Sequence, residues 1–162
     1  MKSRTLHQRS SGVLVPQALG ASDISRVKEF LRIVPALYPG GDEWLDRRLS
    51  ETLAGEAECL LIKDGCSVLG VCIVTPKPRA LKISTLLVCS EARGHGVGAS
   101  LLSRALEIAS DKQLQETYIT VAHHLAEPLT DWLVPWGFTR TALEMNRYGV
   151  GRHECVLTRL GS

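Results

Sequence analysis

Residues 81–110 read LKISTLLVCSEARGHGVGASLLSRALEIAS, and this stretch decides the fold. Its apolar, β-branched run at residues 83–88 predicts a buried strand. A glycine-rich turn, Arg-Gly-His-Gly-Val-Gly, follows at residues 93–98. Beyond it, apolar residues recur at helical spacing and predict one buried helix face, made of Val97, Leu101, Leu102, Ala105, Ile108 and Ala109. A glycine turn between a strand and a helix gathers free backbone N–H groups at the positive end of the helix dipole. The stretch therefore predicts a site for a phosphate-bearing ligand.

Two common phosphate-binding turns fit this segment poorly. A Walker loop is excluded, because no Gly-Lys-Ser/Thr follows the glycines. A dinucleotide-binding turn is formally possible, since Gly94, Gly96 and Ala99 match Gly-x-Gly-x-x-Gly/Ala. Residues 89–93 nevertheless separate the strand from the first glycine, whereas in that fold the strand runs almost directly into it. The ribose-binding acid expected at the end of the next strand is also missing, because residues 122–124 read Ala-His-His.

Length and composition indicate one globular domain. The chain has 162 residues, of which 44% are hydrophobic and 22% charged, so it can bury a core and is too apolar for a disordered chain. We expect residues 1–12, which are polar and basic, to form a flexible tail and residues 13–162 to form the domain. The formal net charge of +2 is too small to indicate a nucleic-acid partner.

Cysteine use and hydropathy predict a cytoplasmic protein. The five cysteines show no Cys-x-x-Cys spacing, which argues against a disulfide framework and against a zinc site, so no metal is expected. We expect no membrane association, because no apolar run is long enough to cross a bilayer and no secretory signal is visible at the N-terminus. The reducing cytoplasm is therefore the expected compartment.

The hydrophobic periodicities predict the order β-α-α-β-β-β-α-β-α-β-β, with about seven strands and about four helices. The expected strands lie at residues 13–15, 59–63, 67–74, 83–88, 117–121, 138–145 and 153–160. The expected helices run from residue 22 or 23 to Pro35, around 44–53, from 97 to about 110, and from about 127 to 134. This order indicates an α/β (α+β) fold in one layered domain.

The glycine turn also resembles the acetyl-CoA signature of the GNAT acetyltransferase superfamily, Arg/Gln-x-x-Gly-x-Gly/Ala. Arg93, Gly96 and Gly98 match it, and the preceding strand and a later Gly-Phe pair at residues 137–138 fall in the usual order. The resemblance covers roughly residues 22–160, as an order of elements rather than as sequence identity. It implies a mixed, mostly antiparallel sheet. It also implies transfer of an acetyl group from acetyl-CoA to a primary amine of a small molecule or protein, by direct attack.

The resemblance further implies where the ligands bind. The pantetheine arm would lie in a gap between the strand 83–88 and the next strand, and the pyrophosphate would lie on the turn and the helix start. The residues expected to bind the cofactor are Leu86, Leu87, Val88, Arg93, Gly94, His95, Gly96, Val97, Gly98, Ala99 and Ser100. In this superfamily the acceptor pocket draws on the first two helices and the loop between them, where Tyr38 and Trp44 are the candidates.

The sequence departs from the family at the residues that handle protons. Leu133 stands where many members have a tyrosine suited to protonating the departing thiolate, and an asparagine near the start of the same helix is also missing. The candidates for a base are His123 and His124, because histidine titrates near neutral pH, and Ser84 on the central strand. Strict alternation along that strand predicts that Ser84 faces away from both Ile83 and Thr85.

Several readings of the function stay open. The missing tyrosine favours a non-catalytic acyl-CoA sensor as the alternative to an enzyme. An enzyme resembling the GNAT toxins that acetylate aminoacyl-tRNA is less favoured, because the net charge is small. A preference for NAD over coenzyme A would support a dinucleotide site instead. A homodimer is also possible, through an apolar helical stripe made of Leu129, Trp132, Leu133 and Trp136.

Overall fold

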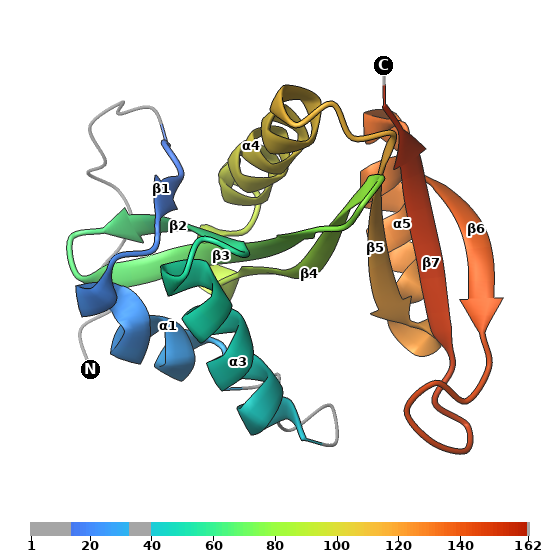
Figure 1. Ribbon diagram of the computed structural model, residues 1–162, viewed down its shortest axis with the longest axis horizontal. Coiled ribbons are helices and arrows are strands. Elements are labelled where there is room, and N and C mark those ends of the chain that lie inside the picture. Colours follow the sequence, from blue (N-terminus) through green and yellow to red (C-terminus); the bar gives the residue numbers. More distant parts are fainter. Residues whose placement is uncertain (1–13, 33–39, 162) are drawn as a thin grey trace.

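A computed structural model of the chain describes residues 14–32 and 40–161. Their seven strands form one sheet in the order β1-β2-β3-β4-β5-β7-β6 (Figure 1). The strands are β1 Gln17–Ala18, β2 Glu58–Asp64, β3 Ser67–Pro76, β4 Ala80–Val88, β5 Glu116–Ala122, β6 Thr139–Glu144 and β7 Glu154–Leu160. The pair β4–β5 is parallel and every other pair is antiparallel. This confirms the predicted mixed, mostly antiparallel sheet.

Helices cover both faces of the sheet. The α-helices of the described segments are α1 Ile24–Phe30, α3 Gly41–Leu53, α4 Val97–Asp111 and α5 Ala126–Leu133. The short 3₁₀ turns η1 Ala21–Asp23, η2 Ser90–Ala92, η3 His123–Leu125 and η4 Val134–Trp136 precede or extend them. Helices α1 and α3 pack on one face, whereas α4 and α5 pack on the other (Figure 1). The predicted element order is confirmed.

The first strand lies further along the chain than the sequence predicts. It was expected at residues 13–15, but β1 is Gln17–Ala18, which pairs with Leu60 and Leu61 of β2. Val15 instead has a side chain that is 61% exposed. Pairing with the edge of β2 therefore decides the position of this strand, not the short apolar run. The predicted tail at residues 1–12 and the predicted helix end at Pro35 lie outside the described residues.

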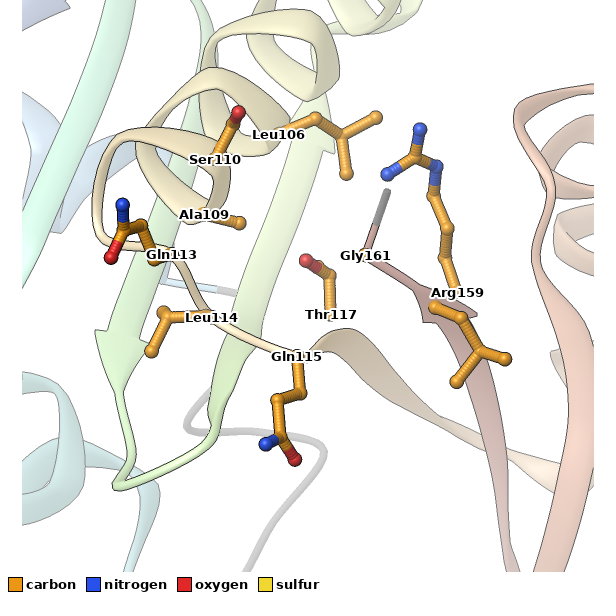
Figure 2. A pocket seen from close by; sticks show the side chains of 10 residues that line it. Leu106, Ala109, Ser110, Gln113, Leu114, Gln115, Thr117, Arg159 and Gly161 are labelled. Atoms are coloured by element: carbon orange, nitrogen blue, oxygen red, sulfur yellow. The ribbon is translucent and has the colours of Figure 1, made fainter.

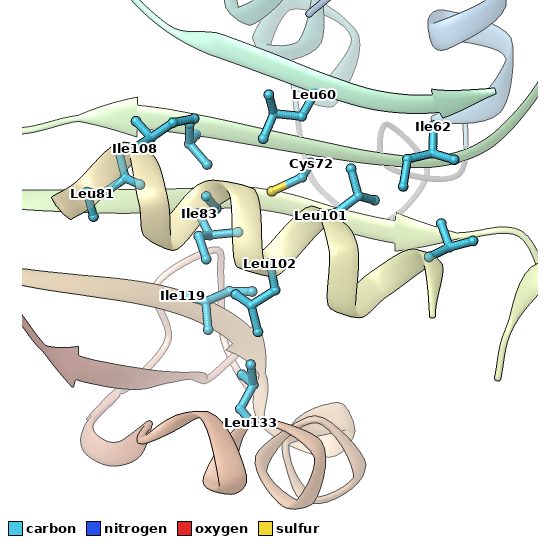
Figure 3. Packing of buried hydrophobic residues seen from close by; sticks show 14 of the residues in the cluster. Leu60, Ile62, Cys72, Leu81, Ile83, Leu101, Leu102, Ile108, Ile119 and Leu133 are labelled. Atoms are coloured by element: carbon cyan, nitrogen blue, oxygen red, sulfur yellow. The ribbon is translucent and has the colours of Figure 1, made fainter. Parts of the chain in front are cut away.

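Most of the core lies between the sheet and α4. The predicted buried face of α4 is confirmed, since Val97, Leu101, Leu102, Ala105, Ile108 and Ala109 are all buried. They pack against side chains of β2, β3 and β4 (Figure 3). Burying one leucine stabilises a fold by about 1.5–3 kcal/mol, so this face holds α4 firmly on the sheet. A second cluster, which includes Val27, Leu45 and Ile73, joins α1 and α3 to the opposite face.

Gly70 of β3 sets how closely α4 approaches the sheet. A Cβ atom at this position would lie 2.7 Å from Cγ1 of Val97 and 2.9 Å from Cδ1 of Leu101. Both distances are too short for non-bonded carbon atoms, so only glycine allows the first turns of α4 to pack here. The start of α4 is thereby fixed next to the end of β4.

A β-bulge in β4 changes the direction of its side chains. Ile83 pairs with Val74 of β3, and Thr85 pairs with Ile73, so Ser84 is an extra residue on β4. Directly paired residues share a face, so Thr85 lies on the α1 and α3 face with Ile73, whose side chain belongs to that cluster. The Ser84 hydroxyl lies on the same face, 3.4 Å from the hydroxyl of Thr75. The predicted alternation is therefore right for Ile83 and wrong for Thr85.

Within the segments 14–32 and 40–161, no helix has the length and apolar character needed to span a bilayer.

Candidate active site

The strands β4 and β5 separate within the sheet. They pair only from Ala80 with Glu116 to Ile83 with Ile119. Beyond these pairs, residues 84–88 of β4 and residues 120–122 of β5 diverge, as the ribbon shows (Figure 1). The bulge at Ser84 coincides with the point of separation. The end of β4 therefore turns one backbone edge toward an opening instead of a neighbouring strand. An extended ligand can form hydrogen bonds with such an edge.

A cavity of about 490 Å³ lies where β4 ends and α4 begins. It is lined by the end of β4, the glycine turn, the first turn of α4, and α5. The lining residues are Leu86, Leu87, Val88, Ala92, Arg93, Gly94, Gly96, Val97, Gly98, Ala99, Leu129 and Trp132. The structure thus brings together all of the predicted cofactor residues except His95 and Ser100, which do not line this cavity.

The glycine turn has the backbone conformation that an anion site needs. Gly94 and Gly96 have φ angles of +77° and +83°, in the left-handed region where a side chain would be strained. The Ser100 amide donates to the Gly96 carbonyl at 3.0 Å. The N–H groups at residues 97–99 come before the first complete turn of α4, so they point out of the helix end. These groups and the helix dipole favour a bound phosphate.

Arg93 stands at the rim of the cavity. Its side chain is exposed, and its Nε donates a hydrogen bond to the Val88 carbonyl at 3.2 Å. This bond ties the glycine turn to the end of β4 and holds a guanidinium group beside the helix start. A fixed positive charge at this place adds to the attraction for a phosphate.

Helix α5 contributes a wall of this cavity that the sequence did not predict. Two ring atoms of Trp132 lie 3.4 and 3.6 Å from the position that a Cβ atom of residue 98 would occupy. Gly98 therefore keeps space open under the indole ring, beside the amides of α4. The helical stripe that suggested a dimer contact is divided in the fold, since Leu133 is fully buried while Leu129 and Trp132 line the cavity. In the sequence, the helical spacing of these apolar residues was the only sign of this wall. That spacing does not show which of the residues face the core and which face a ligand site.

The predicted base candidates lie on two different elements. His123 and His124 lie in η3 directly after β5, and both are exposed. The Nδ1 atom of His123 lies 3.4 Å from the Sγ atom of Cys155. Ser84 lies at the bulge and contacts Thr75. Among residues 14–32 and 40–161, no group of three or more His, Cys, Asp or Glu side chains could hold a metal ion.

Polar side chains lie on the opposite face of the sheet, next to the same separation. Lys82 of β4 pairs with Tyr118 of β5, and both are half-buried on the face that α1 and α3 cover. Burial lowers the pKa of Lys82, and the positive charges of Arg147, Lys77 and Arg48 lower it further. Burial raises the pKa of Tyr118.

Of the two residues predicted to contact the acceptor, Trp44 lies in α3, where its half-buried ring packs on the α1 and α3 cluster. The Arg48 guanidinium lies 5.8 Å from the centre of that ring. Tyr38 lies outside the described residues. Trp44 thus lies on the same side of the sheet as Lys82.

A second cavity of about 490 Å³ lies at the other end of α4 (Figure 2). It lies between the end of α4, the start of β5 and the end of β7. The Thr117 hydroxyl and the Arg159 side chain border it, and the Arg159 Nε donates to the Trp136 carbonyl at 2.8 Å. None of the predicted site residues lines this cavity, so it is separate from the glycine turn.

Comparisons with known proteins place this architecture in a family. A model of the acetyltransferase (GNAT) family matches residues 27–138. The fold is similar to a GNAT family acetyltransferase from Elizabethkingia anophelis with acetyl-CoA bound, with a TM-score of 0.70 and 17% identity over 91% of this chain and 97% of that one. No curated protein matches the sequence.

Two further solved structures share the fold. An aminoglycoside 6′-N-acetyltransferase complexed with coenzyme A has a TM-score of 0.75 and 12% identity, over 92% of this chain and 98% of that one. A ribosomal-protein-alanine N-acetyltransferase from Brucella melitensis has a TM-score of 0.74 and 15% identity, over 91% and 99%. The family model spans most of the sequence, and the separated strands and the glycine turn are in the expected places. The chain therefore belongs to the GNAT family of acetyltransferases.

Proposed function

We propose that this enzyme transfers the acetyl group of acetyl-CoA to a primary amine of a small molecule or protein by direct attack. One observation carries the proposal: β4 and β5 part after Ile83 and Ile119, directly beside the cavity of the glycine turn. An extended arm can enter such an opening while a phosphate group binds at its mouth. Coenzyme A combines both features in one molecule.

The chain offers a partner for each part of the co-substrate. The free backbone edge at residues 86–88 can bond with the amides of the pantetheine arm, as a neighbouring strand would. The amides at residues 97–99 and Arg93 can hold the pyrophosphate. Leu129 and Trp132 supply an apolar wall beside them. Gly98 supports this fit, because any larger residue there would occupy the space under Trp132.

Direct attack needs the amine and the thioester to meet in the opening between the strands. The amine nitrogen forms a bond with the acetyl carbon, the carbon–sulfur bond breaks, and the electron pair leaves on the coenzyme A sulfur. Backbone N–H groups of the free β4 edge can stabilise the negative charge that develops on the carbonyl oxygen. Holding both reactants in line supplies most of the remaining rate enhancement.

The proton balance of this step requires one proton to leave the ammonium group and one to reach the thiolate. His123, His124 and Ser84 stay the candidates for the base. At the position of the family's tyrosine, Leu133 is fully buried and has no ionisable group. We therefore propose that water returns the proton to the sulfur.

We also propose a cytoplasmic enzyme, which the five free cysteines support, since a reducing compartment preserves free thiols. We propose that the acceptor is an amine of a small molecule or a protein and that the enzyme has no membrane partner. The low net charge disfavours a nucleic-acid acceptor.

Calorimetric titration with acetyl-CoA, beside NADH, tests the co-substrate site. Saturable binding of acetyl-CoA is expected, with loss of binding in Arg93→Glu and Gly96→Trp. Arg140→Glu is the matched charge reversal, because Arg140 is exposed on the edge strand β6, away from the turn. A folded protein that binds NADH but neither acetyl-CoA nor coenzyme A would overturn the proposal.

The buried Leu133 also favours a second candidate, a non-catalytic acyl-CoA sensor. Free-thiol release from acetyl-CoA with a panel of amines distinguishes the two. Thiol release that depends on the amine identifies an enzyme. Tight binding without amine-dependent release identifies a sensor.

A further inference from the structure

Lys82 is a half-buried lysine on the face of the sheet that α1 and α3 cover, where Trp44, one of the residues predicted to contact the acceptor, also lies. It lies on β4, one residue before the last pair with β5 and two before the bulge. Within residues 14–32 and 40–161, its ammonium group forms no hydrogen bond and no ion pair with another side chain. A lysine that loses part of its hydration without gaining a partner is destabilising, so an isolated protein gains nothing from it.

The charged groups that surround Lys82 do not compensate for this cost. Three cations lie near it, namely Arg147 from the β6–β7 turn, Lys77 from the β3–β4 loop and Arg48 from α3. One carboxylate, that of Glu144, opposes them. Glu144 already forms an ion pair with Arg147, and Arg48 forms one with Glu51 at 2.7 Å. These two pairs cancel their own charges, so the ammonium groups of Lys82 and Lys77 stay as the surplus positive charge.

The arrangement of strands places the charge of Lys82 beside the reaction opening. The sheet residues paired with Lys82 are Thr75 on β3 and Tyr118 on β5, which both carry hydroxyl groups on the same face. Directly beyond Lys82, β4 and β5 part. An acceptor that enters from the α1 and α3 side would meet the lysine and the two hydroxyls just before the thioester.

From this juxtaposition we propose that Lys82 binds an anionic group of the acceptor, and that the acceptor is an amine that also carries a carboxylate. The inference rests on the function proposed above and narrows its substrate class. A carboxylate placed between Lys82 and the Tyr118 hydroxyl replaces the lost hydration of both groups. A polyamine would instead bring further positive charge to a surface with a surplus of it, so it is disfavoured.

Matched acceptors test this assignment on the full chain. Each amino acid of a panel is compared with its own carboxamide, which keeps the amine and the side chain and removes the negative charge. Acetylation is followed by thiol release from acetyl-CoA. The kcat/KM of each acid is expected to be at least about tenfold above that of its amide. The difference should come from a lower KM for the acid, with kcat nearly equal for the two. Equal rates for acids and amides, or a preference for polyamines, would overturn the proposal.

Variants show whether Lys82 causes that preference. Lys82→Gln is expected to raise KM for the acids about tenfold and to leave KM for the amides nearly unchanged. Lys82→Arg should restore most of the preference, because it keeps the charge. Lys112→Gln is the matched control, since Lys112 is exposed at the end of α4. If Lys82→Gln instead lowers kcat for acids and amides alike and shifts the pH profile, Lys82 acts as the base and the anion site is rejected.

A binding measurement separates this inference from the proposed function. Calorimetry with an N-acetylated amino acid, in the presence of coenzyme A, needs no turnover. Binding that is lost in Lys82→Gln, while the affinity for coenzyme A is kept, supports the anion site even if no amine is acetylated. Failure of every amine to release thiol would reject the proposed function. Equal binding of the acetylated amino acid to both proteins would reject the role of Lys82.

Discussion

Ile83 of β4 and Ile119 of β5 are the last residues that these two strands pair. The next residue of β4, Ser84, is the extra residue of the bulge. The bulge therefore lies at the point where the parallel strands separate. A bulge increases the local twist of a strand, which gives a physical reason for β4 to leave β5 here and expose its edge.

Deleting Ser84 should narrow the opening between β4 and β5 and leave the fold intact. Without this extra residue, Ile83 and Thr85 can keep their pairs with Val74 and Ile73 in regular alternation, so the side chains stay on their faces of the sheet while the added twist of the bulge is lost. We expect the affinity for acetyl-CoA to fall about tenfold or more, measured by calorimetry, with the circular dichroism spectrum unchanged. Deletion of Val150, which is 97% exposed in the β6–β7 turn, is the control and should leave the affinity unchanged. Equal affinities of the Ser84 deletion and the unsubstituted protein would contradict this account of the bulge.

Substituting Gly70 by alanine should push α4 away from the sheet. The new methyl group would overlap Val97 and Leu101, and overpacking of this kind costs about 1–3 kcal/mol. Thermal and urea unfolding measure the loss. Adding Val97→Ala should recover part of it, so the double variant should be more stable than the sum of the single effects predicts.

Gly98→Ala is the matched control for this substitution. Its methyl group would meet Trp132 at an ordinary contact distance of 3.4 Å, and alanine is favoured over glycine within a helix. Its stability should not fall. Equal destabilisation by the two substitutions would show that the space at Gly70 is not what matters.

The tryptophan in the cavity should report the binding of acetyl-CoA. Trp132 lines the cavity, whereas Trp44 lies in α3 on the opposite face of the sheet. Because bound coenzyme A would change the surroundings of the exposed indole, tryptophan fluorescence should change in a saturable titration. Trp132→Phe should remove most of the signal and Trp44→Phe should keep it. A signal that survives Trp132→Phe would place the ligand elsewhere.

Acid should weaken the contact between α1 and the sheet. The Asp23 carboxylate accepts hydrogen bonds from Lys63 at 2.8 Å and from the Gly20 amide at 3.0 Å. The bond from Lys63 is the main cause of a pKa for Asp23 below its usual range. A lowered pKa in the folded state stabilises the protein above the unfolded-state pKa of about 4, and this stabilisation is lost as the pH falls through the folded-state pKa.

Unfolding midpoints in urea at several pH values measure the effect. Asp23→Asn should be less stable at neutral pH and should lose less stability in acid than the unsubstituted protein. Asp46→Asn serves as the control, because Asp46 is exposed and pairs with Lys28 at the surface. Parallel pH curves for the unsubstituted protein and Asp23→Asn would refute the role of Asp23.

The free thiols should differ widely in their reactivity. Cys66 is exposed in the β2–β3 turn, whereas Cys59 and Cys72 are buried. Burial raises the pKa of Cys59 to about 12 and also raises that of Cys72, so neither forms a thiolate near neutral pH. Iodoacetamide followed by mass spectrometry should modify Cys66 first and the two buried thiols only in denaturant. Rapid modification of Cys72 in folded protein would contradict the packing of α4 on β3.

The sequence by itself determined the features that depend on neighbours along the chain. Helical spacing identified every buried residue of α4, from Val97 to Ala109, because a helix repeats its faces regularly. The glycines at 94 and 96 predicted the turn before α4, and the order of strands and helices followed from local periodicity. Most residues of the candidate cofactor site lie in the continuous stretch 86–99, and α5 adds only Leu129 and Trp132. Most of that site could therefore be predicted from the sequence.

The tertiary structure decided the features that depend on contacts between distant segments. A bulge leaves no mark in the sequence, since Ser84 becomes the extra residue only through its register with β3. The strand expected at residues 13–15 moved to residues 17–18 because the edge of β2 pairs there. Trp132 lies beside Gly98 only because α5 packs next to α4. Likewise, the charges of Arg147 and Arg48 act on Lys82 only because remote elements pack together. The burial and the charge of a site depend on contributions from segments that are far apart in the chain. Local sequence patterns do not encode these contributions.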